Sequence, residues 1–216
     1  FSVRNNNERK SLIEDWIRLT VERDLHQITK HKLDSKLALR ILESIAKLNQ
    51  PTLAQISNEL GVNSKKIQNH LNALKILFVV FDIAPFKKSA GKVMYYLTDP
   101  ALLNYFNSTF EKKLTTWFYL ELKSQISYKD LNEIDVCYYK STTSAIVHAV
   151  AEYKNELFVL KLGFQQSYDK RDSLIFETIK KKYSNSYKNI HFTILNGGEN
   201  FFNIDGIRIC PWEAIV

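Results

Sequence analysis

The sequence predicts an α+β fold in which a helical N-terminal domain with a pair of strands precedes an α/β domain. Two helical patterns separated by a glycine turn lie between Gln50 and Leu74. Two segments rich in β-branched and aromatic residues then flank a basic loop, and beyond residue 109 the pattern becomes helix, three strands, helix, strand. The chain has 216 residues, 45% of them hydrophobic, which is enough to bury a core in two small domains.

The N-terminal segment predicts two helices. Residues 8–28 repeat apolar side chains at spacings of three and four, which is typical of an amphipathic helix. A second helix begins at Asp34 or Ser35, because either side chain can cap a first turn. Pro51 ends it, since proline cannot continue a helix and disfavours helical backbone in the residue before it.

Residues 50–74 predict a helix-turn-helix. Thr52 is suited to cap the first helix, and Gly61 supplies the tight turn because glycine adopts positive φ without a Cβ clash. Asn63 or Ser64 caps the second helix, whose inward stripe consists of Ile67, Leu71 and Leu74. Its polar side chains, which can contact phosphates and base edges, are Ser64, Lys65, Lys66, Gln68, Asn69, Asn72 and Lys75.

A β-hairpin is predicted directly after the helix-turn-helix. Residues 77–86 and 93–97 have the composition of strands, and a turn-like basic loop joins them. A hairpin in this position predicts a winged helix over residues 34–106, with the loop as its wing. The loop adds three candidate phosphate contacts, which are Lys87, Lys88 and Lys92.

The polar stretch Asn107-Ser108-Thr109 predicts a domain boundary. We therefore expect a helical lead-in over residues 1–30, the winged helix over 31–108 and the α/β domain over 109–216. The elements predicted for the last domain are a helix over 110–126, strands over 135–140, 144–151 and 156–162, a helix over 168–183, and strands over 190–195 and 206–210.

Several short motifs occur one after another along nearly the whole chain. They are Val21-Glu22-Arg23-Asp24-Leu25, then Pro85-Phe86 with Lys87-Lys88, then Lys92, Tyr95 or Tyr96, Asp99 and Leu102-Leu103. In this order they resemble the region that follows the ATPase core in a large group of prokaryotic AAA-type ATPases. The resemblance implies a winged-helix domain followed by a restriction-endonuclease-like domain of the PD-(D/E)xK type.

The resemblance also implies an ATPase domain ahead of Phe1, and the absence of an initial methionine favours a fragment or a processed start. No GxxxxGK[ST] phosphate-binding loop occurs in the sequence, so ATP and Mg²⁺ are expected only for that missing upstream domain. We expect no cofactor in this chain, and the ATPase domain of the full-length chain is an expected partner.

The nuclease-like domain lacks the acids that the resemblance would place in its active site. Such enzymes hold Mg²⁺ with acids on adjacent strands and use a lysine to position or activate water. Aligned on Tyr138-Tyr139-Lys140, the acidic positions fall on Ala145, Val147 and Val159, and only Lys161 remains. We therefore expect no nuclease catalysis and no bound metal.

Two further points bear on that site. Glu111 matches an acid commonly placed at the start of the preceding helix, although the helix dipole alone also favours an acid there. A shifted alignment brings in Glu133 and Asp135 as acids but still lacks the glutamate at Val159. We regard Glu111 and Lys161 as remnants of a nuclease site, with a solvent-reaching strand-end lysine as the alternative for Lys161.

The charge composition of the chain favours a polyanionic binding partner. The formal net charge of +7 favours binding to nucleic acid, although lysine-rich surfaces also serve solubility. Cys137 and Cys210 form no CxxC pair, which argues against a zinc site. Neither a signal peptide nor a membrane-length apolar run is apparent, so we expect a cytoplasmic protein without a membrane partner.

Three functions remain open at this stage. The first is binding of double-stranded DNA by the winged helix, with the inactive nuclease-like domain adding contact surface or homo-oligomerisation. The second is a protein-interaction or regulatory module of the ATPase without DNA binding, because the fold alone does not decide function. The third is a residual Mg²⁺-dependent nuclease.

Overall fold

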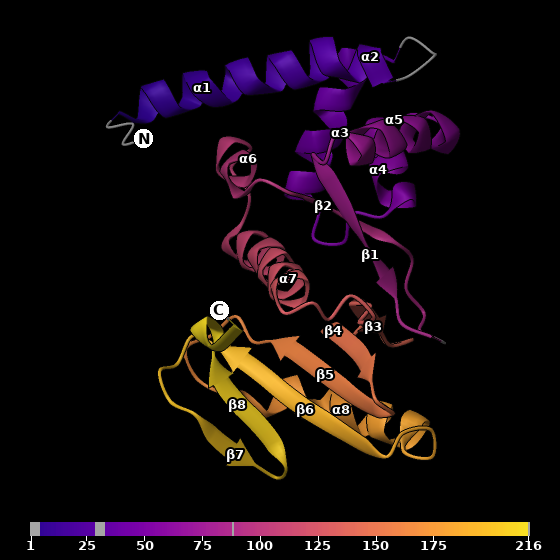
Figure 1. The fold of residues 1–216 in the computed structure, drawn as a ribbon, viewed down its shortest axis with the longest axis vertical. Helices are drawn as coiled ribbons and strands as arrows, with labels where there is room; N and C mark the ends of the chain where they lie inside the picture. The colour runs from indigo at the N-terminus through magenta and orange to yellow at the C-terminus, as the bar shows by residue number, and fades with distance from the viewer. Residues whose placement is uncertain (1–4, 29–32, 88, 216) are drawn as a thin grey trace. The chain divides into compact units, whose positions relative to one another are not determined.

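A computed structural model describes residues 5–28, 33–87 and 89–215. The chain forms two compact units (Figure 1). Unit 1 comprises the residues up to Asp82 together with Val93–Trp117, and unit 2 comprises Ile83–Lys92 together with the residues from Phe118 onwards. The mixed α+β composition predicted from the sequence is confirmed. Within the described residues no helix has the length and apolar character needed to cross a bilayer.

Unit 1 is mainly helical. Its elements are α1 (Asn6–Arg18), a π-helical turn η1 (Leu19–Asp24), α2 (Leu25–Ile28), α3 (Ser35–Lys47), α4 (Leu53–Leu60), α5 (Ser64–Ile76), the start of β1 (Val80–Pro85), β2 (Met94–Leu97), α6 (Pro100–Tyr105) and the start of α7 (Phe110–Tyr128). The helix predicted over residues 8–28 is thus α1, η1 and α2 in succession. The hydrophobic core of the unit draws on α3, α4 and α5 through Ile41, Leu42, Ile45, Ile56, Ile67 and Leu71, all fully buried.

The helix boundaries of unit 1 follow local capping interactions. Asp34, not Ser35, caps α3 by accepting a hydrogen bond from the Leu37 N–H. Thr52 and Gln55 form a reciprocal capping box at the start of α4. Gly61 ends α4 with φ of 62°, the left-handed conformation that glycine favours. These short-range signals are why the helix-turn-helix segment matches its predicted boundaries so closely.

Strand β1 is shorter than predicted, because the first residues of the predicted range complete the end of helix α5. The Leu77 N–H donates to the Ala73 carbonyl, and Phe78 has a positive φ of 56° before the strand begins at Val80. In unit 1, β2 lies next to β1. A bridge between Thr52 and Met94 ties β2 to the start of α4. The helices and the strands of this unit are therefore connected to each other around one hydrophobic core.

Unit 2 is built on a mixed sheet. Its elements are the end of α7, β3 (Cys137–Lys140), β4 (Ile146–Tyr153), β5 (Glu156–Leu162), α8 (Lys170–Tyr183), β6 (Asn189–Asn196), β7 (Phe202–Ile204), β8 (Ile207–Pro211) and η2 (Trp212–Ile215). The strand order is β1-β3-β4-β5-β6-β8-β7. Pairs β3–β4, β4–β5 and β7–β8 are antiparallel, whereas β1–β3, β5–β6 and β6–β8 are parallel.

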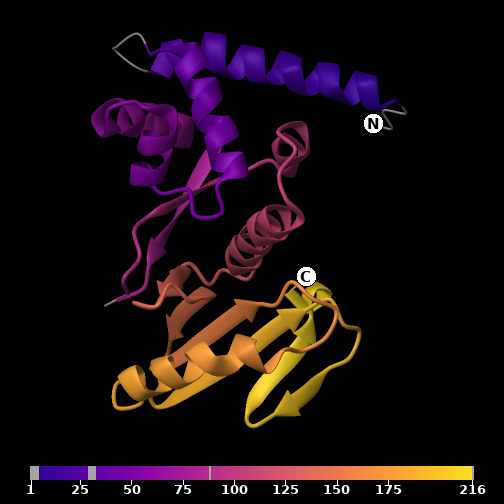
Figure 2. The same ribbon diagram turned by 180° about the vertical axis from the view of Figure 1, so that it is seen from behind.

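Helix α8 packs on one face of this sheet, as the view from behind shows (Figure 2). Phe176 of α8 stacks on Phe192 of β6 at a centroid distance of 4.7 Å. Val147, Val159 and Ile179 are fully buried in the same cluster. Helix α8 begins at Lys170 rather than Tyr168, because the Asp169 side chain caps it by accepting from the Arg171 N–H. Strand β7 was not predicted from the sequence.

Candidate nucleic-acid interface

Helix α5 is held by an exposed cap at its first turn and by a buried histidine on its inner side. The Asn63 side chain accepts a hydrogen bond from the Lys65 N–H at 2.8 Å and caps the first turn. His70 is buried, and its Nε2 accepts from the Asp34 N–H at 3.2 Å while its Nδ1 lies 2.8 Å from the Lys66 carbonyl oxygen. These contacts hold the helix by one side, so the opposite side is presented in a defined orientation.

The outer side of α5 is polar and exposed. Lys65, Asn69 and Asn72 all lie at the surface, at spacings that place them on one helical stripe. Ser64 is also exposed and donates to Ser57 Oγ at 3.0 Å. Gln68 is half-buried and donates to Asn72 Oδ1 at 2.8 Å. The stripe therefore offers an ammonium group and amide groups together.

Two predicted lysines of α5 face acids of the same unit. Lys66 Nζ lies 3.9 Å from Asp34 Oδ2, and Lys75 Nζ lies 2.6 Å from Asp82 Oδ1. Exposed ion pairs of this kind contribute only about 0–1 kcal/mol, so a phosphate could replace either acid at small cost. Glu59, the acid on α4, accepts a hydrogen bond from Ser44 of α3.

The basic loop after β1 belongs to unit 2, although the sequence predicted it as the wing of the first domain. Lys87 Nζ lies 2.7 Å from Glu152 Oε2 on β4. Lys92 is exposed, and its carbonyl accepts a hydrogen bond from Tyr138 Oη at 2.5 Å. Lys88 lies outside the described residues. The loop lysines and the α5 residues thus belong to different units.

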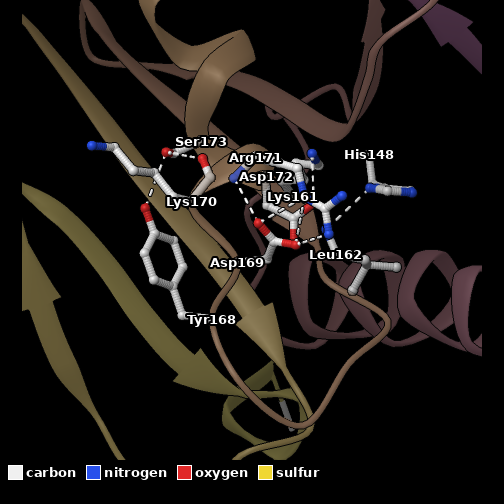
Figure 3. Close-up of polar contacts among 9 residues, drawn as sticks. All are labelled: His148, Lys161, Leu162, Tyr168, Asp169, Lys170, Arg171, Asp172 and Ser173. Carbon is white, nitrogen blue, oxygen red and sulfur yellow. Dashed lines mark hydrogen bonds and ion pairs between the residues drawn. The ribbon is translucent and has the colours of Figure 1, made fainter.

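Lys161 at the end of β5 is paired with an acid that sequence reasoning did not identify. Its Nζ lies 2.8 Å from Asp172 Oδ1 on α8, and both side chains are largely buried, at 15% and 27% exposure (Figure 3). The neighbouring Asp169 caps α8 and pairs with Arg171 at 2.6 Å. Hydrogen bonds from Arg171 lower the pKa of the Asp169 carboxyl. Lys161 therefore does not simply reach into solvent.

Two of the three positions that would carry nuclease acids are apolar core, whereas the third, Ala145, is exposed just before β4. Val147 and Val159 are fully buried in the cluster beneath α8. Val159 and Lys161 share one face of β5, since side chains alternate along a strand. Glu133 and Asp135 lie before β3 begins, both exposed, and neither is part of a strand.

Glu111, the other predicted remnant, is exposed in the first turn of α7 and belongs to unit 1, whereas Lys161 belongs to unit 2. Among the described residues no three His, Cys, Asp or Glu side chains are grouped to hold a metal ion.

A half-buried histidine and a buried lysine were also missed from the sequence. His148 on β4 accepts a hydrogen bond from the Leu162 N–H at 3.0 Å, and burial, with the nearby Lys161 charge, lowers its pKa to about 3 (Figure 3). Lys112 on α7 is buried with its Nζ 4.3 Å from the Tyr96 ring centroid, and burial lowers its pKa to about 7. Neither residue has a sequence signal, because burial depends on contacts distant along the chain.

Solved structures show only a distant likeness to this chain. The chain is similar to a solved structure of Lactococcus lactis ZitR, a point mutant, at 12% identity and a TM-score of 0.28, covering 81% of this chain and 95% of that one. It is also similar to protein VC1899 from Vibrio cholerae at 10% identity and a TM-score of 0.33, and it spans 53% of that chain's length. At these scores neither likeness bears on fold or function.

Among curated proteins the comparison found no match. A family model described as "Domain of unknown function (DUF8612)" matches residues 2–113, which is more than half of the chain. The chain belongs to this family.

Proposed function

We propose that this chain is the nucleic-acid-binding C-terminal region of an AAA-type ATPase and that unit 1 binds duplex DNA through α5. The observation that carries the proposal is the outer stripe of Lys65, Asn69 and Asn72, which is exposed and contains no acid. An asparagine amide can bind adenine N6 and N7 together, and a lysine can bind guanine or a phosphate. The second helix of a helix-turn-helix is the element that enters the major groove in this binding mode.

The order of elements supports a winged helix in unit 1. Helices α3, α4 and α5 are followed by β1 and β2, as the sequence predicts. Lys66 and Lys75 border the stripe, and their exposed ion pairs are weak enough to open for phosphates. We assign phosphate contacts to these lysines and base contacts to the amides.

For unit 2 we propose a nuclease-like domain that does not cut. The succession α7, β3, β4, β5, α8, β6 has the order helix, three strands, helix, strand that the sequence predicts, and the resemblance implies a nuclease-like domain for this region. Burial of Val147 and Val159 supports loss of catalysis, because the side chains at those positions build the core instead of binding metal. Any DNA bound is therefore expected to remain intact in the presence of Mg²⁺.

A titration of a fluorescent 20-base-pair duplex at several salt concentrations tests the α5 assignment. Lys65→Ala should weaken binding to all duplexes alike and reduce the slope of log K against log salt by about one. Asn69→Ala with Asn72→Ala should instead reduce discrimination between duplex sequences by about 1–3 kcal/mol per lost base contact. Lys36→Ala, which removes an exposed lysine from α3, is the matched control. Equal affinities of the Lys65 and Lys36 variants would exclude the α5 interface.

A protein-interaction role is favoured by one different observation. Ile76, the last residue of α5, is 60% exposed and Phe78, two residues later, is 83% exposed, so two large apolar side chains face solvent close together in the chain. If they contact the proposed ATPase domain, Phe78→Ser in the full-length chain should change ATP hydrolysis measured without DNA. Lys65→Ala should leave that rate unchanged. An unchanged rate in both variants would remove this alternative.

A further inference from the structure

A basic groove in unit 2 has no role in the α5 interface. It has a volume of about 490 Å³ and lies between the end of β3 and the last turns of α8. Its lining includes Lys140, Lys181 and Lys182 together with the hydroxyl groups of Ser141, Thr142 and Thr178. Among the residues that the structure describes, no acid contributes to the lining.

The three lysines reach the groove from two elements. Lys181 and Lys182 lie in the last turn of α8, where the helix dipole favours cations. Lys140 ends β3, and the helix dipole gives no reason for a third lysine there. The lysines converge on one concavity even though about 40 residues separate β3 from them. Such convergence concentrates positive potential, because a concave low-dielectric wall focuses the field.

The β3 wall of the groove is fixed by hydrogen bonds. The Lys140 N–H donates to Ser89 Oγ at 2.8 Å, and Ser89 Oγ lies 3.2 Å from the Lys140 carbonyl. Ser141 Oγ accepts from the Ala145 N–H at 3.1 Å. Thr142 and Thr178 are exposed at the rim. The backbone that carries Lys140 and Ser141 is therefore ordered before an anion binds, which lowers the ordering cost of binding.

The groove does not present an aromatic face for stacking. Tyr139 contributes to the lining but is only 3% exposed. Lys182 Nζ lies 5.1 Å from the Tyr139 ring centroid and 3.4 Å from Tyr139 Oη. Single-stranded bases are usually bound by stacking on exposed aromatic rings. Ammonium and hydroxyl donors without such a ring fit phosphate groups and carry little base preference.

We infer that this groove binds the backbone phosphates of a nucleic acid, as a second contact surface that is independent of base sequence. The ligand class rests on the proposed function, whereas the residues belong to a different unit from α5. The groove would raise affinity for every duplex, and α5 would supply discrimination between duplexes.

The test is a titration of the same 20-base-pair duplex with the full chain carrying Lys181→Ala and Lys182→Ala. We expect binding to weaken about three- to tenfold at physiological salt, and the slope of log K against log salt to fall by about two. The effect should be equal for duplexes of different sequence. The matched control is Lys170→Ala with Lys180→Ala, which removes two exposed lysines from the same helix outside the groove.

A second variant avoids disturbing the lysine that packs on Tyr139. Thr142→Asp places a negative charge on the exposed rim and should also weaken binding to every duplex. Equal affinity of Thr142→Asp and the wild type would overturn the proposal, and so would a lysine-pair variant that behaves like its control. Circular dichroism melting identifies any variant that fails to fold, and the other variant then decides.

Competition distinguishes the source of the phosphate. Pyrophosphate that displaces the duplex at micromolar concentration would assign the groove to a small phosphate compound and overturn a backbone site. A polyglutamate peptide that competes as well as unlabelled duplex would assign it to acidic protein segments, with the same consequence. Loss of binding in the groove variants with no effect of Lys65→Ala would support this inference while refuting the α5 interface.

Discussion

Lys161 Nζ and Asp172 Oδ1 lie 2.8 Å apart, so the lysine that the sequence predicts as a nuclease remnant is neutralised by a carboxylate on α8. Asp172→Ala should cost about 1–2 kcal/mol of unfolding free energy. This is more than the ~0–1 kcal/mol of an exposed pair, because the variant leaves a largely buried ammonium group without its partner. Urea denaturation measures the loss. Glu177→Ala, on the exposed side of α8, should change stability little, and a second change, Lys161→Met, should recover part of the loss.

His148 should make stability depend on acidity. Its pKa is lowered from 6.5 to about 3 by burial, so between these values the unfolded chain binds more protons than the folded chain. The unfolding free energy therefore rises with pH across this window, by up to ~1.4 kcal/mol per unit, and is flat above it. His148→Gln removes this contribution. Denaturant titrations of both proteins from pH 4 to 7 should show a difference that shrinks as pH falls; a constant difference would contradict the prediction.

Lys112 should make the unfolding free energy depend on pH in the alkaline range. Burial lowers its pKa from 10.5 to about 7, so between these values the unfolded chain again holds the extra proton. The buried ammonium group of Lys112 disfavours folding, and this cost disappears as the group loses its proton. The wild type should therefore gain stability relative to Lys112→Met as pH rises from 7 toward 10. Melting experiments on the two proteins at matched ionic strength follow this difference. A difference that falls over that interval would show that the ammonium group is stabilised by its surroundings.

Gly91 is required by the ring of Tyr138. A Cβ built at Gly91 would lie 2.1 Å from Tyr138 Oη, which is far inside van der Waals contact. Gly91→Ala should therefore destabilise unit 2 by about 1–3 kcal/mol through overpacking. The same substitution should cost less in a Tyr138→Leu background, where the ring atoms Cζ and Cε2, at 2.5 and 2.8 Å from that Cβ, are absent together with the oxygen. Thermal unfolding of the four proteins gives the coupling directly, and additive effects would refute the contact.

Features set by neighbouring residues could be predicted from the sequence. The Thr52 cap, the Gly61 turn and strand β5 depend on residues within a few positions, and the structure has each of them where it was expected. Two relationships could not be predicted. Lys87 meets Glu152 across 65 positions, and the basic groove joins β3 to the end of α8. Local patterns carry no information on such pairings, because they are set by sheet register and helix packing.

The same physical difference divides the residues of the predicted site. The α5 stripe could be read from helical periodicity, since one helix places Lys65, Asn69 and Asn72 on one side without help from tertiary contacts. The loop lysines could not, because their surroundings depend on which strand pairs with β1. Strand β7 escaped prediction since three residues are too few to show an alternating pattern.

The segment Ile83–Lys92 belongs to unit 2, although the chain on both sides of it belongs to unit 1. Ala84 and Pro85 pair in parallel with Cys137 and Tyr138, and the Ala90 N–H donates to the Lys140 carbonyl at 3.0 Å. A recombinant fragment of residues 109–216 would therefore lose an edge strand and expose unpaired backbone groups along β3, which recruit other strands. We expect this fragment to self-associate in size-exclusion chromatography more than a fragment of residues 79–216. No single cut in the backbone releases both units intact.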